Sequence, residues 1–386
     1  MLIALNKPFD VSCKCRADPG CRTLADYIIC CAIIFNWRSL RVASLAFMLT
    51  STSPTFAADP WAATPVPAIT QQEFRFTNGD TQLVGTLYMP AAGDHLPAVV
   101  ALWGASNPVH DMPLYRHLAQ GLPVMGIAVL IFDRRGSGQS SGTYQSSVYE
   151  QLADDGVAAW QALARLARID SAKIGFWGIS QGGWLAVLAA NHTPQAAFVI
   201  SVSAPLVTPA EQMDFAVTNL LTAHGYSRQE IQEAIQLRHI WQDYLHGRGS
   251  YAATAAALQR GERQPWFQFG YMPTAEELTK DPQTSSTRAN MDYDAFAAVR
   301  AIKVPALFIY GAADPWVPVA SSMERLKDLA KNKPDMTLYV IDGADHTMMP
   351  PSEASLSVDP LTLGKDAPSV PAYFMIMSGW LARHVR

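Results

Sequence analysis

Strands and helices alternate along most of the chain, as the spacing of its apolar positions indicates. Short apolar runs bounded by Gly, Pro, Asn or Asp predict strands, and longer periodic stretches predict helices. Strands are predicted at residues 74–76, 81–88, 97–103, 126–132, 173–177, 197–203, 305–311 and 336–341. Helices are predicted at residues 113–120, 148–167, 183–190 and 371–384. This alternation is typical of a mostly parallel central sheet flanked by helices, the α/β class.

The alternation stops at residues 206–300, where only helices are predicted. These helices are expected at residues 209–223, 227–245 and 251–259, with a further turn near 274–278. Ser227-Arg-Gln-Glu230 and Thr274-Ala-Glu-Glu277 are capping boxes, which support starts at these two points. We therefore predict a helical cap at 206–300, inserted between two parts of one core at 58–205 and 301–386. Such an insertion usually covers the carboxyl ends of the strands, where α/β sheets bind ligands.

Residues 1–57 have the pattern of a signal peptide region. Arg38 and Arg41 precede a short apolar run at 42–49, and Thr55-Phe-Ala57 offers the small residues of a cleavage site. The run is too short to span a membrane, and a buried N-terminal helix is the alternative. We expect a periplasmic or secreted protein without a stable membrane span in its mature form, and a true start downstream of residues 1–37. N-terminal sequencing of the natural protein tests both expectations.

Composition narrows the classes of function. The 386 residues are 49% hydrophobic, enough for a large core, and the formal net charge of −4 without a basic block argues against nucleic acid as a partner. All five cysteines fall in the first 31 residues, without the paired spacing and histidines of a zinc site. We therefore expect no metal centre, and no thiol nucleophile in the rest of the chain. The sequence leaves the oligomeric state open.

The candidate chemistry begins at Gly178-Ile179-Ser180-Gln181-Gly182. This Gly-x-Ser-x-Gly stretch stands between a predicted strand and a predicted helix, which is the context of a nucleophile elbow. In such a turn the serine hydroxyl projects from the edge of the sheet. Ser180 is therefore the predicted nucleophile of an acyl-transfer reaction.

A serine nucleophile needs a general base and an acid that orients this base. His346 stands just past the last predicted strand, and Asp314 just past the strand before it, so both are expected at the edge that carries Ser180. Asp342 and Asp345 are the rival acids, and a turn before Pro315 is the alternative role of Asp314. Two backbone N–H groups should hold the oxyanion, one from Gln181 and one from Ala105, with Gly104 as the alternative.

Four motifs in residues 74–386 resemble the α/β-hydrolase superfamily: the glycine after the third strand, Asp133-Arg-Arg-Gly-Ser-Gly-Gln-Ser140, Gly-x-Ser-x-Gly, and the Gly-x-x-Asp and Asp-His pair. Residues 104–111 are similar to a loop of secreted bacterial esterases related to dienelactone hydrolases and acylaminoacyl-type peptidases. The resemblance implies an α/β-hydrolase fold and a structural turn at the Asp133 motif. This motif also lacks the lysine of a phosphate-binding loop, which argues against nucleotide binding. Trp103 stands where the family usually has histidine, and we expect it to narrow the acyl pocket.

These residues predict a serine hydrolase that cleaves small to medium, fairly apolar carboxylic esters through an acyl-enzyme on Ser180, without a metal or organic cofactor. Trp103, Trp241 and Trp266 are candidates for substrate contact, although packing inside the cap is the more common role of such aromatic residues. The alternative is an aminopeptidase or acylaminoacyl peptidase, which needs an acidic clamp for the substrate amine. Candidates for the clamp are Glu211, Asp214, Glu230 and Asp243. A third hypothesis is a binding protein that keeps the fold without the chemistry.

Overall fold

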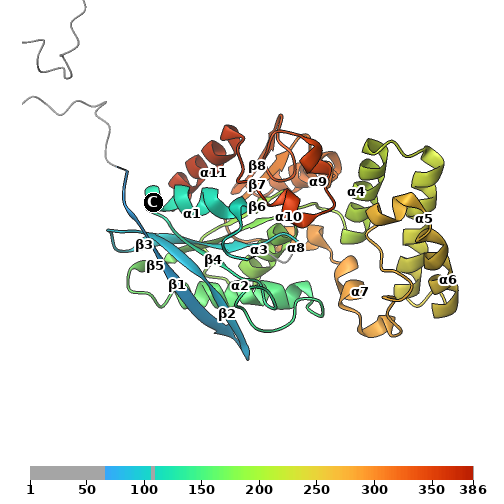
Figure 1. The fold of residues 1–386 in the computed structure, drawn as a ribbon. Helices are drawn as coiled ribbons and strands as arrows, with labels where there is room; N and C mark the ends of the chain where they lie inside the picture. The colour runs from blue at the N-terminus through green and yellow to red at the C-terminus, as the bar shows by residue number, and fades with distance from the viewer. Residues whose placement is uncertain (1–65, 106–108, 386) are drawn as a thin grey trace, which may run out of the picture. The chain divides into compact units, whose positions relative to one another are not determined.

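The computed structural model describes residues 66–105 and 109–385, which belong to one compact unit. The predicted signal region lies outside the described residues. Within them, no helix is long and apolar enough to cross a bilayer. Eight strands form one sheet in the order β1-β2-β4-β3-β5-β6-β7-β8 (Figure 1). From β4 onward the neighbours are parallel, as the α/β pattern predicts.

An antiparallel hairpin opens the sheet. Strands β1 (Ile69–Asn78) and β2 (Thr81–Pro90) pair over their whole length, with a tight turn in which Gly79 has φ of +55°. The strand β1 is longer than the predicted 74–76, and most of its side chains are exposed. Its backbone hydrogen bonds to β2 do not depend on apolar side chains, so hydrophobicity alone underestimated this edge strand.

The central strands carry the main hydrophobic core. They are β3 (Leu96–Leu102), β4 (Ala128–Phe132), β5 (Ile169–Ile179), β6 (Val199–Val202) and β7 (Ala306–Gly311), and β8 (Met336–Ile341) is the edge strand beside β7. Every residue of β4, β6 and β7 is buried. Strands that are covered on both faces read as continuous apolar runs, which explains why the sequence located them well.

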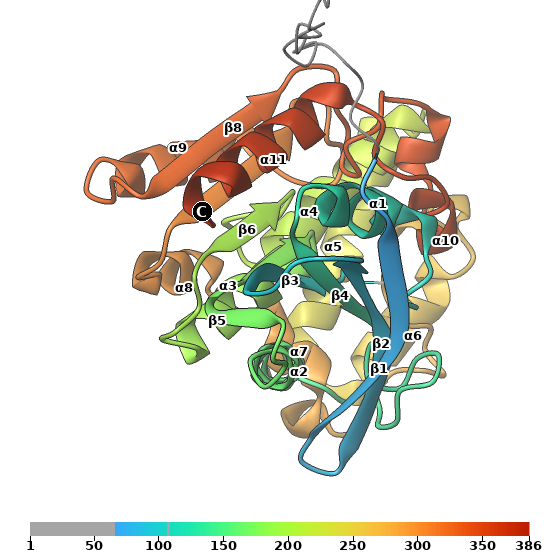
Figure 2. The ribbon, with the colours of Figure 1, turned by 90° about the vertical axis from the view of Figure 1, so that its left-hand side faces the viewer.

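Helices cover both faces of the sheet (Figure 2). On one face lie the short turn η1 (Pro113–Tyr115), α1 (Arg116–Val124) and α11 (Pro371–His384). On the other face lie α2 (Tyr149–Leu163), α3 (Gln181–His192) and α8 (Ala295–Ala301). The helix α9 (Val319–Ala330) contacts β8 and was not predicted, since only a narrow stripe of its surface is buried.

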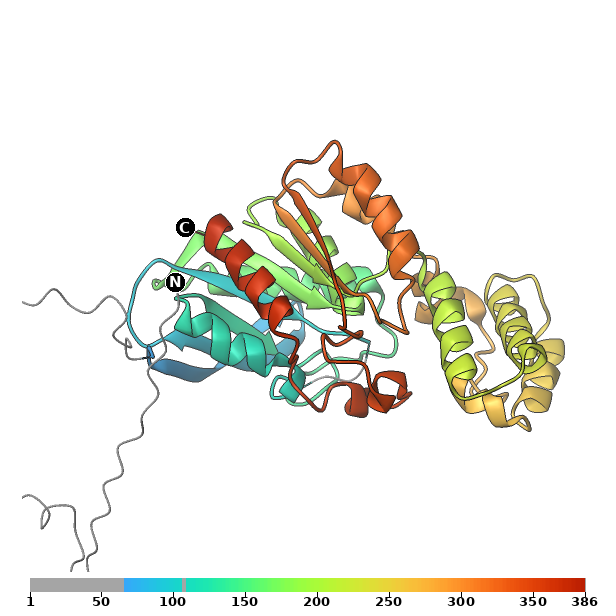
Figure 3. The same cartoon turned by 90° about the horizontal axis from the view of Figure 1, so that it is seen from above.

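The segment after β6 is helical, with a hydrophobic cluster of its own. It contains α4 (Pro209–Ala223), α5 (Arg228–Leu245), α6 (Tyr251–Gly261), η2 (Pro265–Phe269), η3 (Pro282–Thr284) and α7 (Ser286–Met291). Figures 1 and 3 show α4, α5 and α6 gathered outside the layers around the sheet. The buried residues of this cluster include Val217, Leu221 and Trp266.

The main core resumes before the end of the predicted cap segment. Helix α8 packs against α3, and its residues Ala295 and Val299 belong to the main hydrophobic cluster. Two short elements, η4 (Glu353–Leu356) and α10 (Pro360–Leu363), follow β8 before α11 completes the chain. Neither was predicted, because one turn of helix leaves no periodic pattern.

Candidate active site

Ser180 lies in a strained turn between β5 and α3. Its backbone has φ of +56° and ψ of −126°, a conformation that non-glycine residues rarely adopt. The turn is held by bonds from Ser180 N to Val202 O (2.8 Å) and from Gly183 N to Ser180 O (2.9 Å). A Cβ on Gly178 would collide with the Gly182 carbonyl, so the motif's first glycine is required by the close approach of strand and helix.

His346 and Asp314 form a hydrogen-bonded pair. The distance from His346 Nδ1 to Asp314 Oδ2 is 2.8 Å, and both side chains are almost completely buried. The other oxygen, Asp314 Oδ1, accepts the N–H groups of Trp316 (2.8 Å) and Val317 (3.1 Å). The Asp314 carboxylate thus both shapes the turn after β7 and contacts the imidazole.

The two rival acids do not contact the imidazole. Asp342 is exposed to solvent. Asp345 is buried, but its carboxylate accepts hydrogen bonds from the N–H groups of Thr347 and Met349, both at 2.9 Å, and from the Ser355 hydroxyl at 2.5 Å. Its role is to fix the loop that carries His346.

Opposing effects act on the protonation of His346. Burial lowers the pKa of the imidazole, but the charge and hydrogen bond of Asp314, together with the charge of Asp345, raise it by more. The pKa therefore lies above its ordinary value of 6.5. A base with a pKa raised toward neutrality is well matched to accepting a proton and returning it.

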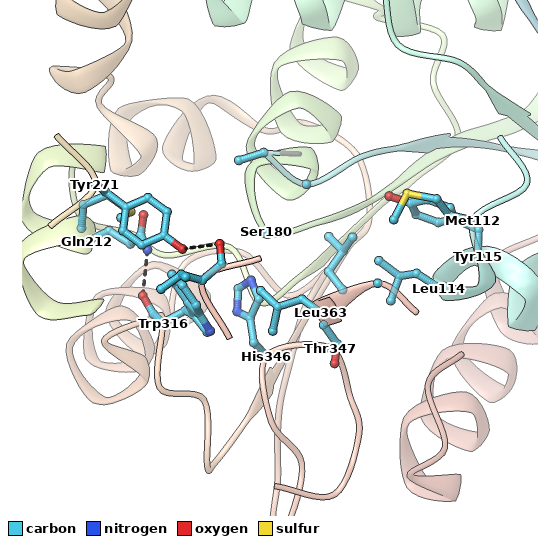
Figure 4. Close-up of a pocket in the computed structure, with 16 residues that line it drawn as sticks. Met112, Leu114, Tyr115, Ser180, Gln212, Tyr271, Trp316, His346, Thr347 and Leu363 are labelled. Carbon is cyan, nitrogen blue, oxygen red and sulfur yellow. Dashed lines mark hydrogen bonds between the residues drawn. The ribbon is translucent and has the colours of Figure 1, made fainter. Parts of the chain in front are cut away.

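Ser180 and His346 line the same cavity, which has a volume of about 290 Å³ (Figure 4). The Ser180 hydroxyl and the imidazole share no direct hydrogen bond in this structure, and catalytic hydrogen bonds often tighten only when substrate binds. Most of the lining side chains are apolar or aromatic. They include Met112, Leu114, Tyr115, Ile179, Met213, Tyr271, Trp316, Val358 and Leu363.

The cavity extends to both sides of Ser180 and His346. Figure 4 shows Tyr271, Gln212 and Trp316 at one end, and Met112, Leu114 and Tyr115 at the other. Residues from β5, the helical segment and the loops after β3, β7 and β8 therefore meet at this place. A group bound across Ser180 would have apolar surroundings in both directions.

The residues expected to hold an oxyanion lie beside Ser180. Gly104 and Ala105 follow β3 and line the cavity, and a Cβ on Gly104 would come within 3.6 Å of Ser180 Cβ. Gln181 is the first residue of α3, where backbone N–H groups have no partner within the helix. Its side-chain oxygen accepts a hydrogen bond from Arg134 Nη2 at 3.1 Å.

None of the three tryptophans suggested for substrate contact lines this cavity. Trp103 is fully buried, and its ring packs edge-on against Phe132 with ring centroids 4.3 Å apart. It therefore forms part of the core beneath the site. Trp241 and Trp266 belong to the hydrophobic cluster of the helical segment. Both side chains therefore pack inside the helical segment, the role that is more common for such aromatic residues.

Most of the apolar side chains that line the cavity had no signal in the sequence. Tyr271 is the aromatic residue of the helical segment that reaches it among the described residues. Tyr271 has φ of +50°, its hydroxyl donates to Val358 O at 3.0 Å, and its ring meets that of Trp316 with centroids 5.7 Å apart. Trp316 had a detectable signal, because it follows β7 two residues after Asp314.

Comparison with known proteins agrees with the fold. The family model described as serine aminopeptidase, S33, matches residues 109–353. An acyltransferase of Aspergillus calidoustus is 34% identical over 105 residues, which is 27% of this chain and 32% of the relative. The chain thus aligns with only about a third of that relative's length.

Two solved structures illustrate the likeness in fold. The esterase Pf2001 of Pyrococcus furiosus has a TM-score of 0.52 at 17% identity, covering 83% of this chain and 92% of its own. A proline iminopeptidase of Mycobacterium smegmatis has a TM-score of 0.50 at 16% identity, covering 81% and 99%. Because the family model spans more than half of the residues, the chain belongs to the serine aminopeptidase S33 family of α/β hydrolases.

Proposed function

We propose that the chain is a serine hydrolase that cleaves carboxylic esters of small to medium, apolar substrates. The observation that carries the proposal is the strained Ser180 turn beside a 2.8 Å His346–Asp314 pair, both on one apolar cavity. A nucleophile, a base and an orienting acid are the parts that acyl transfer requires. Family membership and the likeness to an esterase support a hydrolase.

The proposed reaction has two steps through an acyl-enzyme. Ser180 Oγ attacks the ester carbonyl while His346 Nε2 accepts its proton, and Asp314 holds Nδ1 so that Nε2 is free to act. The N–H groups of Gln181 and Ala105 stabilise the oxyanion. His346 then donates the proton to the leaving alcohol, and water attacks the acyl-enzyme by the same route.

The surroundings of the cavity favour an ester over a peptide with a free amine. No acidic side chain occurs among the described residues that line it. Asp214 pairs with Arg238 and His239, Asp243 with Arg248, and Glu211 and Glu230 cap their own helices. All four candidates for an amine clamp are therefore engaged elsewhere.

A matched substrate panel tests the proposal. Purified protein is given p-nitrophenyl acetate, butyrate and octanoate beside aminoacyl p-nitroanilides, with Ser180→Ala as the control. We expect ester turnover that Ser180→Ala abolishes, and no turnover of the anilides. Anilide turnover above ester turnover would favour the aminopeptidase that the family's description suggests. Absence of both, with Ser180 unreactive toward a fluorophosphonate, would favour the binding protein.

Tyr271 is expected to limit the length of the group bound at its end of the cavity. It is 39% exposed and lines the cavity, so its ring stands at the rim. Tyr271→Ala should make room for a longer acyl chain and so raise the ratio of octanoate to acetate turnover about tenfold. This is the discrimination that roughly one methylene group gives in an apolar pocket. Tyr271→Phe is the matched control, since it loses the bond to Val358 O but keeps the ring. An unchanged ratio in Tyr271→Ala would assign the acyl group to the other end.

A further inference from the structure

Arg134 is a fully buried cation in the turn after β4. The neighbouring carboxylates have other partners: Asp133 binds His110 at 2.7 Å, and Asp155 binds Arg135 at 2.6 Å. Among the described residues, no carboxylate forms an ion pair with Arg134. Burying a charge without a counter-ion is unfavourable, so the contacts of the guanidinium must offset this cost.

One nitrogen of Arg134 connects the two loops beside Ser180. Nη2 donates to Gly104 O and to Gln181 Oε1 (3.1 Å), and it lies 3.5 Å from Trp103 O. The first loop follows β3, and the second is the elbow itself. The residues proposed to supply the oxyanion donors, Ala105 and Gln181, belong to these same two loops.

The geometry of the peptide between Gly104 and Ala105 links Arg134 to the oxyanion. No peptide bond among the described residues is cis. In a trans peptide the carbonyl and the N–H point in opposite directions. Since the Gly104 carbonyl is held by Arg134, the Ala105 N–H points away from the guanidinium. Ala105 itself lines the cavity that contains Ser180.

Aromatic side chains hold the guanidinium in place. Its Cζ lies 4.4 Å from the centroid of the Tyr144 ring and 5.6 Å from that of Trp103. The Tyr144 hydroxyl in turn donates to Ala105 O at 2.9 Å. Arg134 Nε and Nη1 are buried and have no hydrogen-bond partner among the described residues, so the polar contacts of the guanidinium are concentrated at Nη2.

We propose that Arg134 is a positioning residue of the oxyanion hole: it orients and polarises the Gly104–Ala105 amide and fixes Gln181 beside it. A hydrogen bond to a peptide carbonyl strengthens the N–H of the same peptide as a donor. The buried positive charge also favours the negative oxygen of the tetrahedral intermediate, since charges interact strongly where water is excluded. This inference rests on the proposed ester hydrolysis by Ser180.

Two Arg134 variants and a transition-state analogue test the inference. Arg134→Met and Arg134→Lys are compared with wild type on the preferred p-nitrophenyl ester, and each is titrated with an alkyl trifluoromethyl ketone. This ketone gives an oxyanion when a serine adds to it. We expect Arg134→Met to lower kcat about 10²-fold with little change in KM, as losing an oxyanion donor does. The Ki of the ketone should rise in proportion to the loss in kcat/KM, and Arg134→Lys should retain part of both.

Two further variants separate positioning from folding. Arg135→Gln removes the neighbouring, partly buried arginine, whose partner Asp155 lies on α2, and should change thermal stability while kcat stays near wild type. Tyr144→Phe keeps the ring on Arg134 but loses the bond to Ala105 O, and should lower kcat more modestly. It also remains informative if Arg134→Met does not fold.

The inference is overturned if folded Arg134→Met keeps the wild-type kcat and ketone affinity, or if only KM changes. It is also overturned if Arg135→Gln lowers kcat as much as Arg134→Met, because the effect would then be general destabilisation. Failure of the proposed function has a different signature: wild type itself would neither hydrolyse the esters nor react with a fluorophosphonate at Ser180.

Discussion

Ser180→Ala is expected to lower ester turnover on the order of 10⁶-fold, the loss seen when the nucleophile of a serine hydrolase is removed. Without Oγ no acyl-enzyme forms, and only binding and the oxyanion donors remain. His346→Ala should cost about as much, and the double variant should lose little more, because the two residues act as one unit. Initial rates on the preferred p-nitrophenyl ester measure all three variants.

The strained backbone of Ser180 supplies an independent control. Ser180→Gly should be inactive, yet more stable than Ser180→Ala by about 1 kcal/mol or more, since glycine adopts a positive φ without strain. Thermal unfolding of the two variants gives this difference. Substantial ester turnover by either variant would show that another residue is the nucleophile. Equal stability would show that the turn relaxes when the hydroxyl is absent.

Asp314→Asn is expected to lower kcat about 10⁴-fold, because an amide no longer holds the imidazole in the tautomer that leaves Nε2 free to accept a proton. The same change should shift the acid limb of the pH profile. In wild type the pKa of His346 is raised above 6.5, so activity falls as the pH drops through this raised value. Without the Asp314 charge, burial dominates and the limb moves to lower pH.

The same pKa shift affects stability with a definite sign. A raised pKa in the folded state means that His346 stabilises the fold while it is protonated. That contribution is fully present below pH 6.5 and is lost as the pH rises through the raised value. Asp314→Asn should reverse this dependence, because burial then dominates and favours the neutral imidazole in the folded state. Profiles of kcat/KM and of the melting temperature against pH test both effects.

Asp342→Asn is the matched control for the pH experiment. Asp342 is exposed, belongs to the same loop as His346 and does not contact the imidazole. Its replacement should leave the rate and the acid limb unchanged. An acid limb that stays in place in Asp314→Asn, or that moves equally in Asp342→Asn, would contradict the assignment of Asp314 as the orienting acid.

The sequence by itself determined the plan of the fold and the main candidates for catalysis. Strands appear as short apolar runs and helices as longer periodic stretches, so β8, α4 and α11 were predicted with the bounds that the structure has. Ser180, Asp314 and His346 were found because each follows a strand whose carboxyl end lies at one edge of a parallel sheet. This reasoning needs only local pattern and chain order.

The tertiary structure alone decided what surrounds these residues. Trp103 and Tyr271 are both aromatic and both lie near predicted site segments, yet one is in the core and the other on the cavity. Arg134 is separated from Gln181 by 47 positions and still binds its side chain. Such contacts depend on how distant segments pack, and side-chain direction at a loop is not encoded in periodicity. The local pattern therefore predicts which residues are candidates for catalysis, and tertiary packing sets the shape and charge of the cavity around them.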